Sequence, residues 1–191
     1  MTPIIVYFNI CWMKEYRGIT DSDKPQRGGK FIPEHGYGSE IYNFQPFEDR
    51  LYGFVEPGYK PQPRCIDIKK LGASKTASSV SGILVVWVAR DPMRPRTVVV
   101  GWYKDATVYR ERRAARIGST RMLPSGTQAK YFVLAEEQNC ELVPAHKRNH
   151  EIPRGGKGEL GETNIWYAKG EVGSKVKAST YAYISNYRVN P

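Results

Sequence analysis

The sequence has few cysteines and histidines and no long hydrophobic run. Its 191 residues include three cysteines (Cys11, Cys65 and Cys140), which are too few and too scattered for a disulfide framework or a zinc motif. This usage favours a reducing, cytoplasmic setting. No apolar run approaches the roughly 20 residues of a membrane span, and the N-terminal segment lacks the basic region and cleavage site of a signal peptide. We therefore expect a soluble globular protein without a membrane partner.

Familiar catalytic motifs are also missing. The chain has no His-Glu-x-x-His, no phosphate-binding P-loop and no Gly-x-Ser-x-Gly. His146 and His150 have the spacing of a helical metal pair, which leaves open a metal-dependent nuclease or an RNA-modifying enzyme. A zinc or nuclease site would need more ligands than these two. We therefore predict a binding domain with no catalytic residue, no metal and no cofactor.

Positive charge is in excess. The chain has 29 Lys and Arg against 19 Asp and Glu, a net charge of +10 and a pI near 9.5. Such an excess predicts a polyanionic partner, most simply nucleic acid. Aromatic residues make up 12% of the chain, and basic and aromatic side chains together suit a surface that binds phosphates and stacks bases. A protein-interaction module whose charge is incidental is a further alternative.

Two β-branched runs, 83–88 and 97–103, predict a long hairpin in the middle of a sheet. Alternation places Ile83, Val85 and Trp87 on one face of the first strand, with Leu84, Val86 and Val88 on the other. In the second strand it groups Val98, Val100 and Trp102 against Thr97, Val99 and Tyr103. Both faces are apolar, so we expect the hairpin to be covered on both sides. Gly101 predicts a bulge or a close backbone approach.

The remaining pattern predicts an α+β, β-rich fold. Further short strands are expected at 4–10, 51–55, 65–68 and 129–134, and a final helix at 175–187 with Ser174 as its N-cap. A long glycine-rich loop covers 17–40. We predict one domain over 1–191, either a whole protein or a domain cut from a longer one.

Three blocks carry a resemblance: VYFNICWMKEY, the hairpin SGILVVWVAR with TVVVGWYKDATV, and GETNIWYA. They resemble EVE and YTH domains, members of the PUA superfamily together with the ASCH and SRA-like domains. The resemblance implies a small β-barrel with long loops and a few short helices, which binds nucleic acid around a flipped base. It further implies a reader of modified bases from a bacterial or archaeal modification-dependent restriction system, with any nuclease in another domain or subunit. DNA is expected rather than RNA.

The candidate site residues lie at strand ends. A flipped base needs stacking and a hydrogen-bonding edge, and three tryptophans end apolar runs, whereas Trp87 is expected in the core. For the other tryptophans, core packing is the alternative. The predicted base-binding residues are Trp12, Tyr16, Trp102, Tyr103, Asp105, Tyr109, Trp166 and Tyr167. The predicted phosphate-binding residues are Arg110, Arg112, Arg113, Arg116, Lys147, Arg148 and Arg154.

Overall fold

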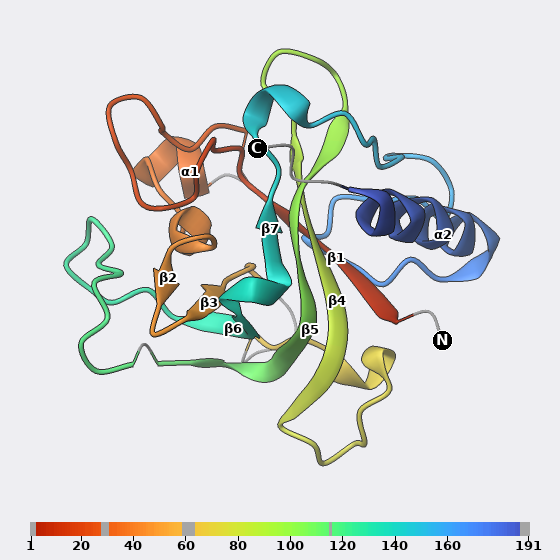
Figure 1. The fold of residues 1–191 in the computed structure, drawn as a ribbon, viewed down its shortest axis with the longest axis horizontal. Helices are drawn as coiled ribbons and strands as arrows, with labels where there is room; N and C mark the ends of the chain where they lie inside the picture. The colour runs from red at the N-terminus through yellow and green to blue at the C-terminus, as the bar shows by residue number, and fades with distance from the viewer. Residues whose placement is uncertain (1–2, 28–30, 59–63, 115, 188–191) are drawn as a thin grey trace.

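A computed structural model of the chain describes residues 3–27, 31–58, 64–114 and 116–187 (Figure 1). The strands are β1 (Ile4–Ile10), β2 (Pro46–Phe47), β3 (Arg50–Gly53), β4 (Ser79–Arg90), β5 (Thr97–Arg113), β6 (Tyr131–Glu136), β7 (Cys140–Leu142) and β8 (Ile165–Trp166). The helices are α1 (Phe31–His35) and α2 (Gly170–Asn186), and short 3-10 segments are η1 (Ser39–Tyr42), η2 (Ile68–Leu71), η3 (Glu137–Asn139) and η4 (Ala145–Lys147).

The strands form one mixed sheet in the order β2-β3-β6-β5-β4-β1-β8, and β7 pairs separately with β5. The β4–β5 hairpin is antiparallel, whereas β1 runs parallel to β4. In the described part of the chain no pairing joins β2 to β8, so the sheet is open. The expected α+β, β-rich class is confirmed, but a closed barrel is not shown.

Two hydrophobic clusters lie on opposite faces of the central strands. Ile83, Val85 and Trp87 belong to the larger cluster, which also includes residues of β1, β3 and β6. Leu84, Val86 and Val88 belong to the smaller cluster, which α2 covers (Figure 1). The predicted division of the first strand and the burial of both faces of the hairpin are therefore confirmed.

The predicted faces of β5 are wrong beyond Gly101. Val98, Val100 and Tyr103 share the larger cluster, whereas Trp102 lies with Val99 under α2. The cause is a register shift where Gly101 pairs with Trp87 and Val99 with Val88, because such a bulge reverses the side-chain alternation. The predicted close backbone approach is confirmed, since a Cβ at Gly101 would overlap the carbonyl oxygen of Glu141 on β7.

Two further expectations change in detail. The predicted strand at 65–68 is absent, and η2 begins at Ile68 with the left-handed Gly72 (φ +89°) ending it. Helix α2 begins at Gly170 rather than 175, so Ser174 lies inside the helix and donates to the Gly170 carbonyl (2.9 Å) instead of capping it. The glycine-rich loop contains α1 and part of η1, and Ile41 and Phe44 bury its end in the larger cluster.

Candidate nucleic-acid interface

The predicted phosphate-binding residues lie toward two different ends of the sheet. Strand β5 begins beside the β4–β5 turn at the top of Figure 1 and ends at Arg113 near the bottom. At roughly 3.3 Å per residue, a strand of 17 residues has a contour of about 50 Å. Arg112 and Arg113 are thus far along the strand from the turn. We call their end the far end.

The tryptophan and tyrosine that follow β1 are buried in the larger cluster. Trp12 is 8% exposed, and the Arg148 guanidinium lies 4.7 Å from the centre of its ring. Tyr16 is buried and donates a hydrogen bond from its hydroxyl to the Cys11 carbonyl (2.7 Å). Burial raises the pKa of the Tyr16 phenol. Neither ring presents an open stacking face in this arrangement.

The aromatic residues of β5 separate onto opposite faces. Trp102 is 3% exposed and packs edge-on against Tyr183 of α2 and against Tyr187, which follows the helix. Tyr103 is fully buried on the other side, where its hydroxyl donates to the Asn43 carbonyl. The two neighbours therefore cannot wall one pocket.

The other predicted base-binding residues are spread over the molecule. Trp166 is half-buried against Tyr7 (5.0 Å between ring centres), and the half-buried ring of Tyr167 faces the ammonium of Lys70. Asp105 is exposed and has a left-handed backbone (φ +50°) at a second register shift of the hairpin. Tyr109 is half-buried and packs edge-on against Tyr131. The structure does not bring the eight predicted residues together.

Several predicted phosphate-binding arginines already have partners within the protein. Arg110 donates to the carbonyls of Ala77 (2.9 Å) and Lys75 (3.0 Å). Arg116 forms an ion pair with Glu48 (3.0 Å). Arg113 is exposed and lies over the ring of Tyr109, and Arg112 is exposed. At the far end, Arg112 and Arg113 are therefore the most available cations of the predicted group.

Arg148 has a different environment from its exposed neighbour Lys147. It is 2% exposed and donates to three carbonyls, those of Val143 (2.8 Å), Met13 (2.6 Å) and Lys14 (2.7 Å). Burial lowers the pKa of its guanidinium. These bonds join the segment after β7 to the segment after β1. In this conformation the Arg148 side chain holds two loops together and does not reach solvent.

The β4–β5 turn gathers arginines that the sequence does not place together. Arg90, Arg94 and Arg27 line a hollow of about 240 Å³ with Asp91 and Pro92. Arg90 also lines a neighbouring hollow of about 480 Å³, together with Arg154. We call Arg27, Arg90, Arg94 and Arg154 the arginine rim. Among the described residues, no carboxylate lies within ion-pair distance of these four side chains.

Only Arg154 of the rim was a predicted phosphate-binding residue. The link DPMRPR between the two hairpin strands signals arginines at a turn, but Arg27 and Arg154 come from distant parts of the chain. Arg27 reaches the turn by donating to the Pro92 carbonyl (3.4 Å), and Arg154 donates to the Asn9 side chain at 3.2 Å. Tertiary contacts therefore assemble the rim.

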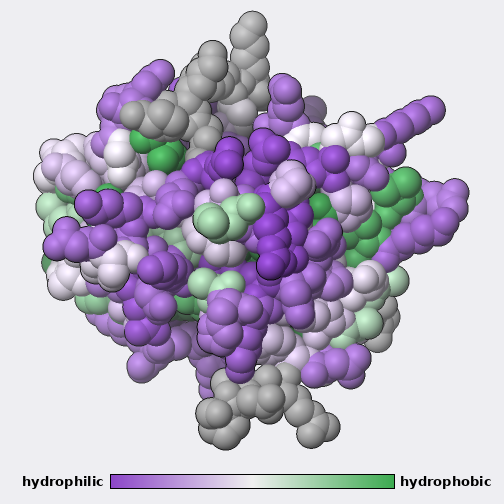
Figure 2. Space-filling model, turned by 90° about the horizontal axis from the view of Figure 1, so that it is seen from above, coloured by the Kyte–Doolittle hydropathy of each residue, from purple (hydrophilic) through white to green (hydrophobic). Residues whose placement is uncertain are grey.

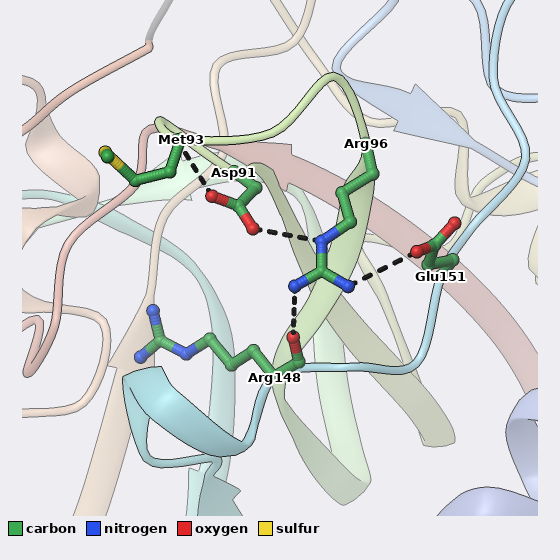
Figure 3. A network of polar contacts seen from close by, with 5 residues as sticks. All are labelled: Asp91, Met93, Arg96, Arg148 and Glu151. Atoms are coloured by element: carbon green, nitrogen blue, oxygen red, sulfur yellow. Dashed lines mark hydrogen bonds and ion pairs between the residues drawn. The ribbon is translucent and has the colours of Figure 1, made fainter.

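A network of polar contacts fixes the turn (Figure 3). Asp91 accepts hydrogen bonds from the backbone N–H of Met93 (2.9 Å) and from Nε of Arg96 (3.0 Å). Arg96 also contacts Glu151 (3.3 Å) and the Arg148 carbonyl (3.3 Å). Burial opposes ionisation of Asp91, but these donors hold the pKa of its carboxyl below the usual value. The turn is thus braced by its own carboxylate.

The surface around the turn is hydrophilic. Figure 2 views the molecule from above relative to Figure 1, and hydrophilic residues cover most of that face, with small hydrophobic patches between them. Met93 at the turn is 87% exposed. Burial lowers the pKa of the Arg154 guanidinium, and the positive charge of Arg90 lowers it further. An anion between these side chains would relieve that repulsion.

The two histidines of the enzyme alternative do not share a helix. His146 is exposed in η4, which ends at Lys147, whereas the His150 carbonyl accepts from Val99 of β5 (2.9 Å). The His150 ring stacks on Tyr183 (4.5 Å) and lies 3.2 Å from the Thr180 hydroxyl. In the part of the chain described here, no group of three His, Cys, Asp or Glu residues is arranged to hold a metal ion.

The same part of the chain contains no helix with the length and apolar character that crossing a membrane requires. Comparisons of the chain with models of protein families, with curated proteins and with solved structures found no match. The function has to be inferred from the residues themselves.

Proposed function

We propose that this protein binds nucleic acid through the arginine rim. One observation carries the proposal: four arginines surround a braced turn, and no carboxylate among the described residues is within ion-pair distance of them. Arginine suits this role because its planar fork of donors matches phosphate oxygens and stays charged at all working pH values. The net charge of +10 supports the same partner.

The proposal includes recognition of a flipped, modified base in DNA, as the resemblance to EVE and YTH domains implies. Met93 supports it, because proteins that open a base stack often insert an apolar side chain such as methionine between base steps. It is 87% exposed in a turn that Asp91 and Arg96 hold. Of the predicted aromatic residues, Trp12 follows the strand that ends beside the rim, since Ile10 of β1 pairs with Ala89. Its ring is buried, so it would have to turn out of the larger cluster to stack on a base.

The PUA-like architecture is a further part of the proposal. The larger hydrophobic cluster draws on five strands of one sheet, which suits a sheet that curves around its core. A reader role in a modification-dependent restriction system would leave cutting to another domain or subunit. The three cysteines are free thiols, which is compatible with the proposed cytoplasmic location.

Salt-dependent binding tests the proposal. We expect the affinity for duplex DNA to fall as salt rises, with a slope near −0.9 in log affinity for each neutralised phosphate. The variant Arg27→Gln/Arg94→Gln removes two exposed rim charges, so it should flatten that slope by roughly 1.8. The loss should be similar for all sequences, because phosphate contacts position the duplex without reading it.

A matched variant at the far end is the control. Arg112→Gln/Arg113→Gln removes the same charge from the exposed arginines that the sequence predicted as phosphate ligands. If this variant loses binding and the rim variant does not, the interface lies at the far end of β5 and the rim proposal fails. Equal binding by all three proteins would place the interface elsewhere and refute the rim proposal. A flat salt dependence of the unmodified protein, or no binding at low salt, would refute the nucleic-acid proposal altogether.

A further inference from the structure

We infer that the hollow of about 480 Å³ beside the rim is a phosphate-binding subsite, with Arg90 and Arg154 as its ligands. The inference deepens the proposed function and rests on it for the source of the phosphate. The hollow lies between the β4–β5 turn and the segment 151–155. We call it the Arg90–Arg154 hollow.

The two walls of the Arg90–Arg154 hollow are fixed to each other. Ile152 donates its backbone N–H to the Thr97 carbonyl (2.8 Å), and Val98 pairs with Glu151 in an antiparallel bridge. Arg90 is the register partner of Thr97 at the end of the hairpin. Arg90 and Arg154 are far apart in the sequence, but these backbone hydrogen bonds hold both residues at the wall of the same hollow. This is the preorganisation that anion binding requires.

The charges that line the hollow do not cancel. Three arginines line it (Arg90, Arg96 and Arg154) against one carboxylate, that of Glu151. Glu151 is committed to Arg96 at 3.3 Å, and Arg96 is also paired with Asp91 at 3.0 Å. Arg90 and Arg154 are left facing each other's charge. The direction of the Arg154 pKa agrees, although Glu162 acts in the opposite sense and partly offsets Arg90.

Thr97 is an independent indication that the hollow binds an anion. It lines the hollow, is 3% exposed, and its hydroxyl has no hydrogen-bond partner among the described residues. Buried hydroxyls in proteins are nearly always paired, because an unpaired one costs free energy. The Thr97 hydroxyl oxygen has almost no accessible surface, so a rotation of the Thr97 side chain toward the hollow would let an oxyanion there accept its hydrogen bond.

The position of the hollow indicates which phosphate it takes. Arg90 and Pro95 line both this hollow and the smaller one at the turn, so the two are neighbours along the rim. A strand that follows the rim would therefore pass the mouth of the hollow. The ligand class is a phosphate group carried by nucleic acid, and a free phosphate has the same chemistry.

The test uses inorganic phosphate and short DNA on the full chain. We expect saturable shifts of the backbone amide signals of Arg90, Thr97 and Gly155 in two-dimensional NMR when phosphate is added. Arg154→Gln should abolish these shifts, and so should Arg90→Gln. The Arg90 side chain is exposed, so this second variant separates loss of the ligand from loss of the fold. Thr97→Val should weaken them. Arg112→Gln, at the far end, is the matched control and should leave them unchanged.

DNA-binding measurements distinguish the proposed subsite from the proposed function. We expect Arg90→Gln/Arg154→Gln to weaken DNA binding by about tenfold or more, the range for losing a charged hydrogen bond. If phosphate shifts the hollow's signals but DNA does not bind, the subsite stands for a small phosphate and the proposed function fails. If DNA binds with unchanged affinity and salt slope in this variant, and phosphate moves no signal of the hollow, the subsite is overturned while the proposed function survives.

Discussion

Replacing Arg148 by methionine tests whether this residue is structural. The change keeps most of the side-chain length but removes the N–H groups that donate hydrogen bonds to three carbonyls. The bonds to Val143 and Met13 are buried, and the bond to Lys14 is partly buried. An unsatisfied buried polar group costs roughly 1–3 kcal/mol, so the two buried carbonyls alone account for about 2–6 kcal/mol.

Two effects move this value in opposite directions. Removing the buried guanidinium abolishes its desolvation cost, which also lowers the pKa of Arg148. Against that, the variant loses the contact of the guanidinium with Trp12. We expect a net loss of about 3 kcal/mol in the free energy of unfolding, a large fraction of the stability of an ordinary domain. Urea unfolding followed by tryptophan fluorescence measures it as a lower midpoint with an unchanged slope.

The exposed neighbour supplies the control. Lys147→Met changes the same charge one residue away and should alter the free energy of unfolding by no more than about 0.5 kcal/mol. A loss below about 1 kcal/mol for Arg148→Met, accompanied by weaker DNA binding, would refute the structural role and restore Arg148 as the phosphate ligand that the sequence predicted.

Three more predictions concern the sheet and its helix. Burial lowers the pKa of His150 from 6.5. As pH falls, the unfolded chain therefore binds a proton at this residue before the folded chain does, so the free energy of unfolding should decline below pH 6.5. Urea midpoints of His150→Gln should show a smaller decline over the same pH range. Gly101→Ala should destabilise the protein by about 1–3 kcal/mol, because the new methyl group would overlap Phe44 and Glu141, whereas Gly161→Ala, with open space around it, should melt normally. Trp102→Ala should cost about 3–5 kcal/mol in thermal or urea melts, because the indole is buried under α2; a variant that melts normally but no longer prefers a modified base would identify it as a cage wall instead.

Local sequence pattern was sufficient for the central strands. The β-branched runs predict β1, β4 and β5, because a short alternating or continuous apolar run of β-branched residues is typical of a buried strand. The division of β4 into two buried faces followed from the same alternation. For β5 the alternation failed, since register shifts near Gly101 and Asp105 change which side each residue faces. Gly101 indicates a bulge in the sequence. The size of the register shift at that bulge depends on the partner strand, which the residue types do not give.

The arginines were harder to assign, because a sequence does not distinguish a buried arginine from an exposed one. Arg148 and Arg121 are 2% and 1% exposed, although both follow residues typical of polar surface segments. Burial is possible because backbone carbonyls accept hydrogen bonds from their N–H groups. Every residue carries such a carbonyl, so the residue types do not indicate which carbonyls will lie beside an arginine. The rim was missed for the related reason that Arg27 and Arg154 approach Arg90 only through tertiary contacts.

The two ends of β5 differ in how their positive charge is held, and this difference favours the rim. At the far end, Arg116 forms an ion pair with Glu48, so part of that charge is already compensated. At the turn, Asp91 and Glu151 compensate Arg96 alone. The ion pairs that hold the turn therefore compensate the charge of one arginine, whereas the charges of the four rim arginines are not compensated by an ion pair with any described residue. A rigid support under uncompensated cations binds phosphate with little ordering cost, which a group of free surface arginines does not provide.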